Sequence, residues 1–332
     1  MVEGTEGSHH KEGSTKMRKH NMVCAGIDTG KRRLDAAVEG CSEQLWVDNS
    51  PAGHHALSDW LRQRRVMRVG IEASGGHEQE IVRKLRRDGL VVIVFQPAQV
   101  RAYAKFHLQR AKNDKLDAAL IAACTAATKK IHAPPDPRLA PFAEHLTLVE
   151  QITEDIAHRK TCRETCRDPR IRRFWDQEIA RLKQVLQLEI KGLVAAIRQH
   201  RDLAERLDLI ASIDGLGLRT AVAILVRMPE IGRITREQAA ALAGLAPYDD
   251  DSGDQVGVRH IEAGRERLRK ALYTAALPAA FHWNPQLNSM YRRLVSAGKP
   301  HKVALVACAR KLLIYANTVV ERGTPWTKSA PT

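Results

Sequence analysis

The sequence predicts an α/β N-terminal domain built on a mixed sheet, followed by a helical, coiled-coil segment and a mainly α C-terminal domain. Short apolar runs separated by turn residues occupy the first third of the chain, which is typical of strands. The Pro-rich segment Ala133–Pro137 ends this pattern, and apolar residues then recur at helical spacing. The expected parts are an arm at residues 1–21, the α/β domain at 22–132, the linker and coiled coil at 133–207, the helical domain at 208–322 and a tail at 323–332.

Three strands joined by tight turns are expected to open the N-terminal domain. They cover residues 23–28, 34–38 and 44–47, and a turn signal at 39–42 separates the second from the third. Such short spacing predicts an antiparallel meander. Helices and strands then alternate: a helix at 54–65, a strand at 66–71, a helix ending at Asp88–Gly89, a strand at 90–95 and an alanine-rich helix at 113–128.

This order of elements predicts a mixed sheet covered by helices, arranged as in a ribonuclease-H-like domain. A dinucleotide-binding domain would instead begin with a βαβ unit and a turn of the form G-x-G-x-x-G, which Gly26–Gly30 lacks. The same residues look like the first phosphate loop of actin-like and sugar-kinase ATPases. Those proteins need a second Asp-x-Gly loop after another such sheet, and the helical second half offers no such sheet.

The middle of the chain is expected to form a helical hairpin or a short coiled coil. One apolar stripe runs over residues 146–156, and Asp168–Pro169 ends this helix. A second stripe has alternating four- and three-residue spacing, with Glu189 at a position where a strict heptad requires an apolar residue. Its members are Trp175, Ile179, Leu182, Leu186, Ile190, Leu193 and Ile197.

The charge of the chain predicts a polyanionic partner, most simply nucleic acid. Its 332 residues include 53 Lys and Arg against 38 Asp and Glu, which gives a net charge of +15. No run of about 18 uncharged apolar residues occurs, so no membrane span is expected. Residues 1–20 lack the apolar core of a secretory signal, and the six cysteines are scattered, which predicts reduced thiols in a cytoplasm.

Four carboxylates are candidates for a metal site. Asp28 and Glu72 end two of the expected strands, whereas Asp114 and Asp117 begin the last helix of the domain, three residues apart on one helical face. Such a cluster repels itself at neutral pH unless cations fill it, and hard oxygen ligands favour Mg²⁺. Two Mg²⁺ ions held in this way would stabilise the attacking and leaving oxygens of a phosphodiester displacement. The alternative is that the four are ordinary solvated acids.

A glycine-rich turn is the candidate for gripping a DNA backbone. Ile213–Thr220 precedes an apolar helix, and its Gly215 and Gly217 would let backbone N–H groups approach a phosphate, as in a helix-hairpin-helix. A tight turn between core helices explains the two glycines equally well. Further candidate contacts are Lys112 and Lys115 beside the acidic pair, Arg219 in the turn, and Arg259, Arg265, Arg267, Arg269, Lys270, Lys299 and Lys302 in later basic clusters.

Together these features resemble the 110 family of bacterial insertion-sequence transposases, also called bridge-RNA-guided recombinases, and the related pilin-gene invertases. The resemblance spans residues 23–320. Its first part looks like the family's RuvC-like domain, whose DEDD metal site corresponds to Asp28 in Gly-Ile-Asp, Glu72 in Gly-Ile-Glu-Ala-Ser-Gly, and Asp114 and Asp117 in Lys-Asn-Asp-Lys-Leu-Asp-Ala. Its second part looks like the C-terminal transposase domain, with family motifs in order at residues 213–217, 242–247, 267–273 and 298–307.

The resemblance implies a DNA transposase or recombinase. It assigns Ser252, in Ser252-Gly253, as a nucleophile that attacks a DNA phosphate and holds the strand as a transient phosphoserine, assisted by Mg²⁺ at the acidic site. It also implies a dimer or tetramer with composite sites, a structured bridge RNA that pairs with donor and target DNA, and a place at the nucleoid in a bacterial cytoplasm.

The residues before the candidate serine differ from the family pattern. Asp249, Asp250 and Asp251 occupy positions where relatives often carry basic or polar residues, and these carboxylates would repel DNA phosphate unless a metal or a basic neighbour offsets them. Two alternatives therefore stay open. One is a RuvC-like metal-dependent nuclease, or an invertase that uses no RNA, and the other is a catalytically inactive nucleic-acid-binding derivative.

Overall fold

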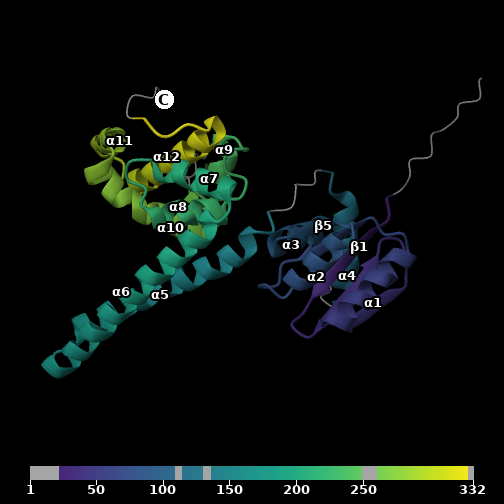
Figure 1. Ribbon diagram of the computed structural model, residues 1–332. Coiled ribbons are helices and arrows are strands. Elements are labelled where there is room, and N and C mark those ends of the chain that lie inside the picture. Colours follow the sequence, from purple (N-terminus) through teal and green to yellow (C-terminus); the bar gives the residue numbers. More distant parts are fainter. Residues whose placement is uncertain (1–21, 109–113, 130–135, 249–259, 328–332) are drawn as a thin grey trace, which may run out of the picture. The chain divides into compact units, whose positions relative to one another are not determined.

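The chain forms two compact units, residues 1–134 and 135–332, each with its own core. The computed structural model describes residues 22–108, 114–129, 136–248 and 260–327 (Figure 1). The first unit is built on a sheet and the second is mainly helical. This confirms the predicted change from an α/β half to a helical half.

A five-stranded mixed sheet in the order β3-β2-β1-β4-β5 forms the centre of the first unit. The antiparallel meander predicted from the turn spacing is confirmed and consists of β1 (Cys24–Thr29), β2 (Arg33–Val38) and β3 (Gln44–Asp48). On the other side of β1, β4 (Arg68–Glu72) and β5 (Val91–Phe95) are added in parallel. The two kinds of pairing make β1 the central strand.

Helices cover both faces of this sheet (Figure 1). Apolar residues of α1 (Pro51–Gln63) and α2 (Gln79–Arg87) pack with the alternate strand residues of one face, whereas α3 (Pro97–Phe106) and α4 (Asp114–Ala127) pack on the other. The first helix begins three residues before its predicted start, because the Ser50 side chain caps it and a proline occupies its first turn. The sequence did not predict α3.

The second unit begins with the predicted helical hairpin. Figure 1 shows α5 (Leu139–Thr165) and α6 (Pro169–Arg198) side by side, and an isoleucine–leucine cluster packs between them. The carboxylate of Asp168 caps α6 by accepting a hydrogen bond from Arg170 N at 2.7 Å. Glu189, the residue that interrupts the heptad pattern, lies 2.7 Å from His145 Nε2 across the hairpin. This hydrogen bond gives the Glu189 carboxylate a polar partner, which the apolar seam could not provide.

The rest of the second unit packs around one buried helix, α8 (Leu218–Arg227), in which residues 220–226 are all buried. Its other described elements are a two-stranded ribbon, a π-helical turn and five further helices. They are α7 (Arg201–Ala211), α9 (Arg236–Leu242), β6 (Pro247–Tyr248), β7 (His260–Ile261), α10 (Glu266–Pro278), η1 (Ala279–Trp283), α11 (Pro285–Ser296) and α12 (His301–Arg322).

The last of these helices, α12, is long and apolar enough to cross a membrane by length and composition alone. However, 56% of its apolar window is buried inside the unit, and Arg310 and Lys311 lie within the helix. Its buried side chains belong to the main core cluster together with those of α8 and α10. These contacts identify α12 as a core helix.

Candidate functional site

Two glycines let a helix lie directly on the sheet in the first unit. Gly26 of β1 and Gly70 of β4 are paired in register, and both face α4. A Cβ atom on Gly26 would lie 2.2 Å from the carbonyl oxygen of Ala118 and 2.2 Å from the amide nitrogen of Ala122. A Cβ atom on Gly70 would lie 1.9 Å from Thr125 Oγ1. Larger residues at these positions would therefore push α4 off the sheet.

The contacts of α4 show that it runs antiparallel to β1 and β4. Ala118, near the start of the helix, packs on Gly26, two residues before Asp28. At the other end, the carbonyl oxygen of Thr128 accepts a hydrogen bond from Nη1 of Arg68, the first residue of β4, at 2.9 Å. The first turn of α4 therefore lies at the carboxyl edge of these strands, where parallel strands present their last side chains together.

This edge brings predicted carboxylates to one end of one sheet face. Because the register of β1 and β4 pairs Ile27 with Ile71, the next residues, Asp28 and Glu72, are neighbours. Ile27 and Ile71 belong to the core under α1 and α2, so the alternation of a strand places Asp28 and Glu72 on the face that α4 covers. Both carboxylates and Asp117 are half-buried, and each interacts with another group of the chain.

A further carboxylate, Asp35, lies beside Asp28 and was not among the predicted site residues. The register of β1 and β2 pairs the two aspartates directly, and cross-strand partners share a face. Asp35 forms an ion pair with Arg33, whose guanidinium lies 5.1 Å from the centre of the Trp46 ring. The Arg33 charge offsets part of the negative charge at this edge. In the sequence, the length of the turn between β1 and β2 sets their register, and this could have identified Asp35 as the cross-strand neighbour of Asp28.

Asn49 joins the loops that follow Asp28 and Glu72. Its side-chain amide nitrogen donates hydrogen bonds to the carbonyl oxygens of Gly30 at 3.0 Å and His77 at 3.1 Å. The side-chain oxygen of Asn49 then accepts a hydrogen bond from Nε2 of His54, 2.7 Å away. His54 is buried, and burial lowers the pKa of its imidazole, which favours the neutral ring. These bonds fix the backbone on both sides of the acidic edge.

Glu78 closes the loop that follows Glu72. Its carboxylate accepts hydrogen bonds from the backbone N–H groups of Ser74 at 3.0 Å and Gly76 at 2.9 Å, and from the Ser74 hydroxyl at 3.1 Å. Burial alone would raise the pKa of Glu78, but these hydrogen bonds lower it below its ordinary value. The carboxylate is therefore charged at neutral pH and occupied by the loop. The sequence pattern predicted no role for it.

The donor set at the acidic edge suits a hard divalent cation, because Asp28, Glu72 and Asp117 offer only carboxylate oxygens. Among the side chains that the structure describes, no three His, Cys, Asp or Glu residues converge closely enough to hold a metal ion. The side chain of the fourth predicted ligand, Asp114, lies outside the described part. Its backbone begins α4, one helical turn before the contact with Gly26.

In the second unit, the glycine-rich turn joins α7 to α8, and its two glycines differ. Gly215 has a φ of 94°, and a Cβ atom on it would lie 2.4 Å from the Cβ atom of Ala279, so packing requires glycine there. Gly217 precedes α8, is exposed, and has open space where a Cβ atom would be. Asn284 fixes the turn by donating to the carbonyl oxygen of Asp214 at 3.0 Å. The tight-turn interpretation explains Gly215 but not Gly217.

Several of the predicted basic contacts already have partners inside the second unit. Three cations, two in α10 and one just before it, bind glutamates at 2.6 to 2.8 Å. The pairs are Arg265–Glu230, Arg267–Glu150 and Lys270–Glu154. Arg219 is exposed and donates to Thr153 Oγ1 at 3.3 Å. Lys299 and Lys302 are exposed and have no ion pair within the described residues. Lys112, Arg259 and the side chain of Lys115 lie outside those residues.

Ser252 and the three aspartates before it also lie outside the described residues. The chain on either side of them is well anchored, because β6 and β7 pair in an antiparallel ribbon. Behind the ribbon, Gly244 and Gly264 meet backbone to backbone, and Arg269 donates to the carbonyl oxygen of Ala263. These contacts bring the two ends of the serine-containing segment together on the second unit.

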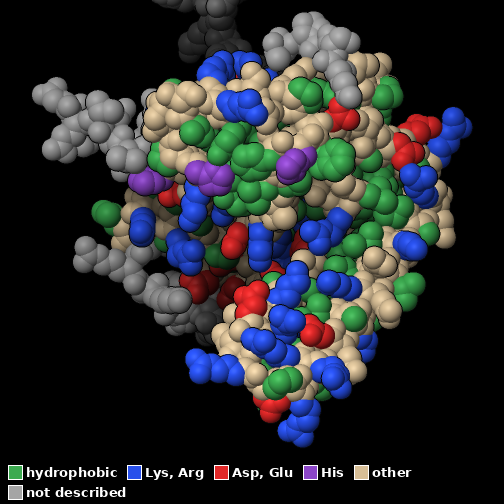
Figure 2. Space-filling view, turned by 90° about the vertical axis from the view of Figure 1, so that its left-hand side faces the viewer, with side chains coloured by type: hydrophobic (Ala, Val, Ile, Leu, Met, Phe, Trp, Pro, Cys, Tyr) green, Lys and Arg blue, Asp and Glu red, His purple; other side chains and the backbone are tan. Residues whose placement is uncertain are grey.

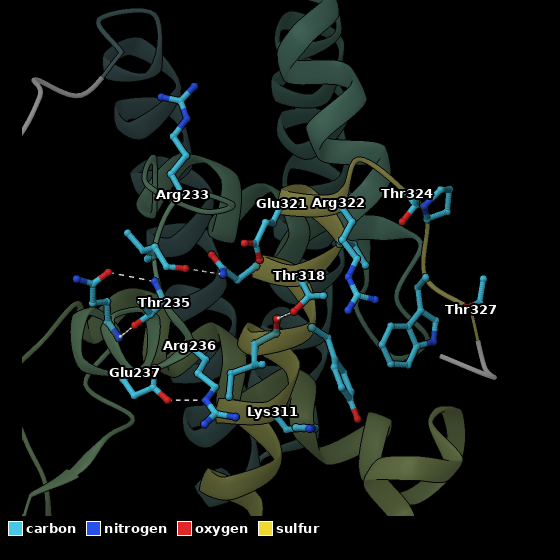
Figure 3. Close-up of a pocket in the computed structure, with 18 of the residues that line it drawn as sticks. Arg233, Thr235, Arg236, Glu237, Lys311, Thr318, Glu321, Arg322, Thr324 and Thr327 are labelled. Atoms are coloured by element: carbon cyan, nitrogen blue, oxygen red, sulfur yellow. Dashed lines mark hydrogen bonds and ion pairs between the residues drawn. The ribbon is translucent and has the colours of Figure 1, made fainter. Parts of the chain in front are cut away.

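A cavity of about 620 Å³ lies between α9, α12 and the C-terminal segment of the second unit (Figure 3). Figure 3 shows Arg236 paired with Glu237 on one wall and Lys311 on another, so the lining carries both signs of charge. Asn317 joins the walls, since it accepts a hydrogen bond from Gly232 N and donates one to the carbonyl oxygen of Ile234, both at 2.8 Å. These bonds give Asn317 a structural role.

Comparison with known proteins connects the two units to one family. A family profile described as "Transposase", of the DEDD type of IS110 elements, matches residues 25–165, and the profile "Transposase IS116/IS110/IS902 family" matches residues 207–292. Pilin gene-inverting proteins of Moraxella bovis and Moraxella lacunata are each 26% identical over 328 residues, covering 91% of this chain and 97% of the relatives. An IS110 insertion-element protein of Streptomyces coelicolor, described as uncharacterized, is 30% identical over 125 residues, covering 37% of this chain and 31% of that protein.

The matched regions contain the features described above. The first profile spans the strands that carry Asp28 and Glu72 and the helix that begins at Asp114, and DEDD nuclease-like transposase domains typically use a divalent metal. The second profile spans the glycine-rich turn and both ends of the serine-containing segment. The chain therefore belongs to the IS110 family of transposases, enzymes that recombine DNA.

Proposed function

We propose that this transposase cuts and rejoins DNA strands at a site that combines a Mg²⁺ centre with a serine nucleophile. Asp28, Glu72, Asp114 and Asp117 would hold two Mg²⁺ ions, and Ser252 would attack the DNA. One observation supports the Mg²⁺ centre: α4 packs on Gly26 and Gly70, and its first turn lies at the sheet edge that carries Asp28 and Glu72. The all-oxygen donor set of that edge fits a hard cation.

The chemistry conserves the number of phosphoester bonds. The Ser252 hydroxyl oxygen forms a bond to the phosphorus of a DNA phosphodiester while one bridging P–O bond breaks, and the departing sugar oxygen takes up a proton. A sugar hydroxyl of a second strand then attacks the same phosphorus, and Ser252 leaves and regains its proton. Bound Mg²⁺ would supply charge stabilisation for the scissile phosphate. Because the bond energy is stored in the phosphoserine, rejoining needs no external energy source.

The remaining residues of the first unit would keep the acidic edge in position. Asn49 and Glu78 hold the loops beyond Asp28 and Glu72, so the carboxylates keep their spacing when DNA binds. The Arg33–Asp35 pair would lower the repulsion that Asp28 experiences from its cross-strand neighbour. These residues act on the carboxylates and do not touch the DNA in this proposal.

We further propose that the partners are DNA, a structured non-coding bridge RNA and other copies of the chain. The net charge of +15 supports binding to nucleic acids. The names of the Moraxella relatives support inversion of a DNA segment as one form of the reaction. A dimer or tetramer would bring the serine of one copy of the chain to the acidic edge of another copy. We place this reaction in the cytoplasm of a bacterium.

The test is to incubate the purified protein with Mg²⁺ and a plasmid that carries its gene with the flanking DNA. The parent protein should form an adduct with DNA that survives on a denaturing gel, and Ser252→Ala and Asp28→Asn should each abolish both the adduct and recombination. Full recombination by Ser252→Ala would contradict the serine role. Cleaved DNA without an adduct would identify a RuvC-like nuclease, and binding without any cleavage would identify an inactive derivative.

The RNA part of the proposal has its own test. RNA that copurifies with the protein is sequenced and mapped to the DNA around the gene. A discrete structured RNA from beside the gene is the expected result. Random fragments, together with recombination by protein stripped of RNA, would identify an invertase that uses no RNA.

A further inference from the structure

An exposed group of aromatic rings lies where η1, α11 and α12 meet in the second unit. The π-helical turn η1 carries Phe281 and Trp283, whose residues are 41% and 65% exposed. Tyr291 of α11 and His301, the first residue of α12, lie against Phe281. We call these four residues the aromatic platform. They have no part in the acidic edge, the serine-containing segment or the cavity beside α9.

Three rings of the aromatic platform, those of Phe281, Tyr291 and His301, hold one another in fixed orientations, and Trp283 follows two residues after Phe281 in η1. The rings of Phe281 and His301 stack at 6.3 Å between centroids with an angle of 18°, and Tyr291 meets Phe281 edge to face at 5.0 Å. The Tyr291 hydroxyl lies 2.6 Å from His301 Nδ1, which fixes the imidazole plane. A surface that is already ordered loses little conformational entropy when a flat ligand binds to it.

The helices that carry the aromatic platform add only positive charge before Glu321, and the acid nearest in the described contacts is Asp214, whose carbonyl oxygen binds Asn284. Between Glu266 and Glu321 the sequence has no Asp or Glu, whereas it has nine Lys and Arg. Four of these are exposed and have no ion pair among the residues that the structure describes; they are Arg292, Arg293, Lys299 and Lys302. Figure 2 shows histidine side chains among hydrophobic ones, with Lys and Arg side chains above them and a mixture of Lys or Arg and Asp or Glu side chains below. Charge complementarity therefore favours a polyanion with flat apolar groups.

The π-helical turn η1, which carries Phe281 and Trp283, packs against the glycine-rich turn. Gly215 packs on Ala279, the first residue of η1, and Asn284, the residue after η1, donates to the carbonyl oxygen of Asp214. The glycine-rich turn then leads to the exposed start of α8 at Gly217. Backbone N–H groups at the start of a helix bind phosphate, and aromatic rings bind bases, so the two features suit different parts of one nucleotide chain.

We propose that the aromatic platform binds unpaired bases of a single-stranded nucleic acid by stacking, while the surrounding cations bind its phosphates. This inference rests on the proposed function for the class of partner, but on neither the serine nor the metal site. Bases in a duplex are stacked on one another and show only their edges, so the platform selects an unpaired segment. The segment belongs to RNA or to a DNA strand opened during exchange, because both present the same base faces and phosphates.

The experiment measures binding of short RNA and DNA homopolymers, and of a DNA duplex of the same length, by fluorescence anisotropy. Trp283→Ala should weaken binding to single strands by about 5- to 150-fold, the range expected for the loss of one stacked base. Phe281→Leu keeps the apolar volume but loses the aromatic face, and should weaken binding in the same direction. Trp283→Tyr keeps an aromatic face and should bind nearly as well as the parent.

A control variant in the first unit distinguishes stacking on the platform from a general effect of losing an exposed ring. Trp46→Ala removes a comparably exposed tryptophan, 62% exposed, and should leave binding to single strands unchanged. A loss of binding that is confined to RNA, confined to DNA or common to both supports the platform and identifies which nucleic acid it binds. The proposal would be overturned by unchanged binding of Trp283→Ala and Phe281→Leu, or by an equal loss of binding to the duplex. A change of oligomer size in light scattering, with binding intact, would also overturn it. Binding is measured without Mg²⁺ and without strand exchange, so failure of the platform is distinguishable from failure of the proposed recombination.

Discussion

Replacing Gly26 by alanine tests how the acidic edge is assembled. The new Cβ atom would lie 2.2 Å from Ala118 O and from Ala122 N, whereas ordinary van der Waals contact begins at 3.4 Å. Both neighbours are backbone atoms of α4, so no rotamer change can relieve the overlap. The helix would have to retreat from β1 by about 1.2 Å, the difference between the two distances.

Such a retreat separates Asp114 and Asp117 from Asp28 and Glu72. Metal–ligand distances tolerate about 0.2 Å, and a misplacement of about 1 Å costs roughly 100-fold in rate. Overpacking of this kind lowers the free energy of unfolding by about 1–3 kcal/mol, which most domains survive. Gly26→Ala should therefore stay folded and lose at least roughly 100-fold in recombination.

The assay combines plasmid recombination with thermal unfolding at several Mg²⁺ concentrations. If the proposed site binds Mg²⁺ in the folded state, the parent should melt at a higher temperature as the Mg²⁺ concentration rises, and Gly26→Ala should lose most of this dependence. Gly192→Ala is the matched control, since its new Cβ atom meets nothing closer than 3.9 Å, and it should gain about 0.5–1 kcal/mol of stability and keep its activity. If Gly26→Ala recombines and melts like the parent, α4 does not lie on the sheet as described.

Three further predictions concern residues that stabilise one unit or the other. Burial keeps the pKa of His54 below its ordinary 6.5, so the stability that the neutral imidazole contributes is complete above pH 6.5 and is lost as the pH falls below that value. Urea unfolding at about pH 7.5 and 5.5 should show this loss of stability in the parent and a smaller loss in His54→Gln. Glu150→Gln removes a carboxylate that binds Arg227 at 2.8 Å from a position only 20% exposed, and should lower the free energy of unfolding by about 1–3 kcal/mol in calorimetry, whereas an unchanged melting curve would show that the ion pair is not formed. Asn317→Ala leaves Gly232 N without its partner and should cost a similar amount, about 1–3 kcal/mol, and a variant as stable as the parent would contradict the bridging role.

The antiparallel part of the sheet in the first unit followed from local chemistry. The turns after β1 and β2 are too short for any connection except a hairpin, which made the meander predictable. Placing Asp28 and Glu72 at the ends of strands then sufficed to expect them at one edge, because parallel strands end together. The start of α1 is also encoded locally, by Ser50 and the proline after it, although the apolar spacing alone placed it three residues later.

The supporting residues could not be predicted in this way, because their roles depend on contacts between distant positions. Asn49 reaches Gly30 across 19 residues and His77 across 28. Likewise, a basic run in the sequence does not reveal which cations are already paired. Arg267 finds its glutamate 117 residues earlier in the chain, which is why its predicted DNA contact competes with an internal ion pair.

The structure also explains how a protein can keep repelling carboxylates close together. Asp28 and Glu72 are neighbours on adjacent strands, so their charges repel each other, and the proposed Mg²⁺ ions would offset this repulsion. The opposing force comes from apolar packing of α4, whose Ile121 is fully buried over the paired glycines. At the proposed site, stability and catalysis would therefore depend on different atoms of the same helix. A substitution on the buried side of α4 would alter the spacing of the charges without removing any of them, so under the proposed function the glycines of β1 and β4 position the site as much as the acids do.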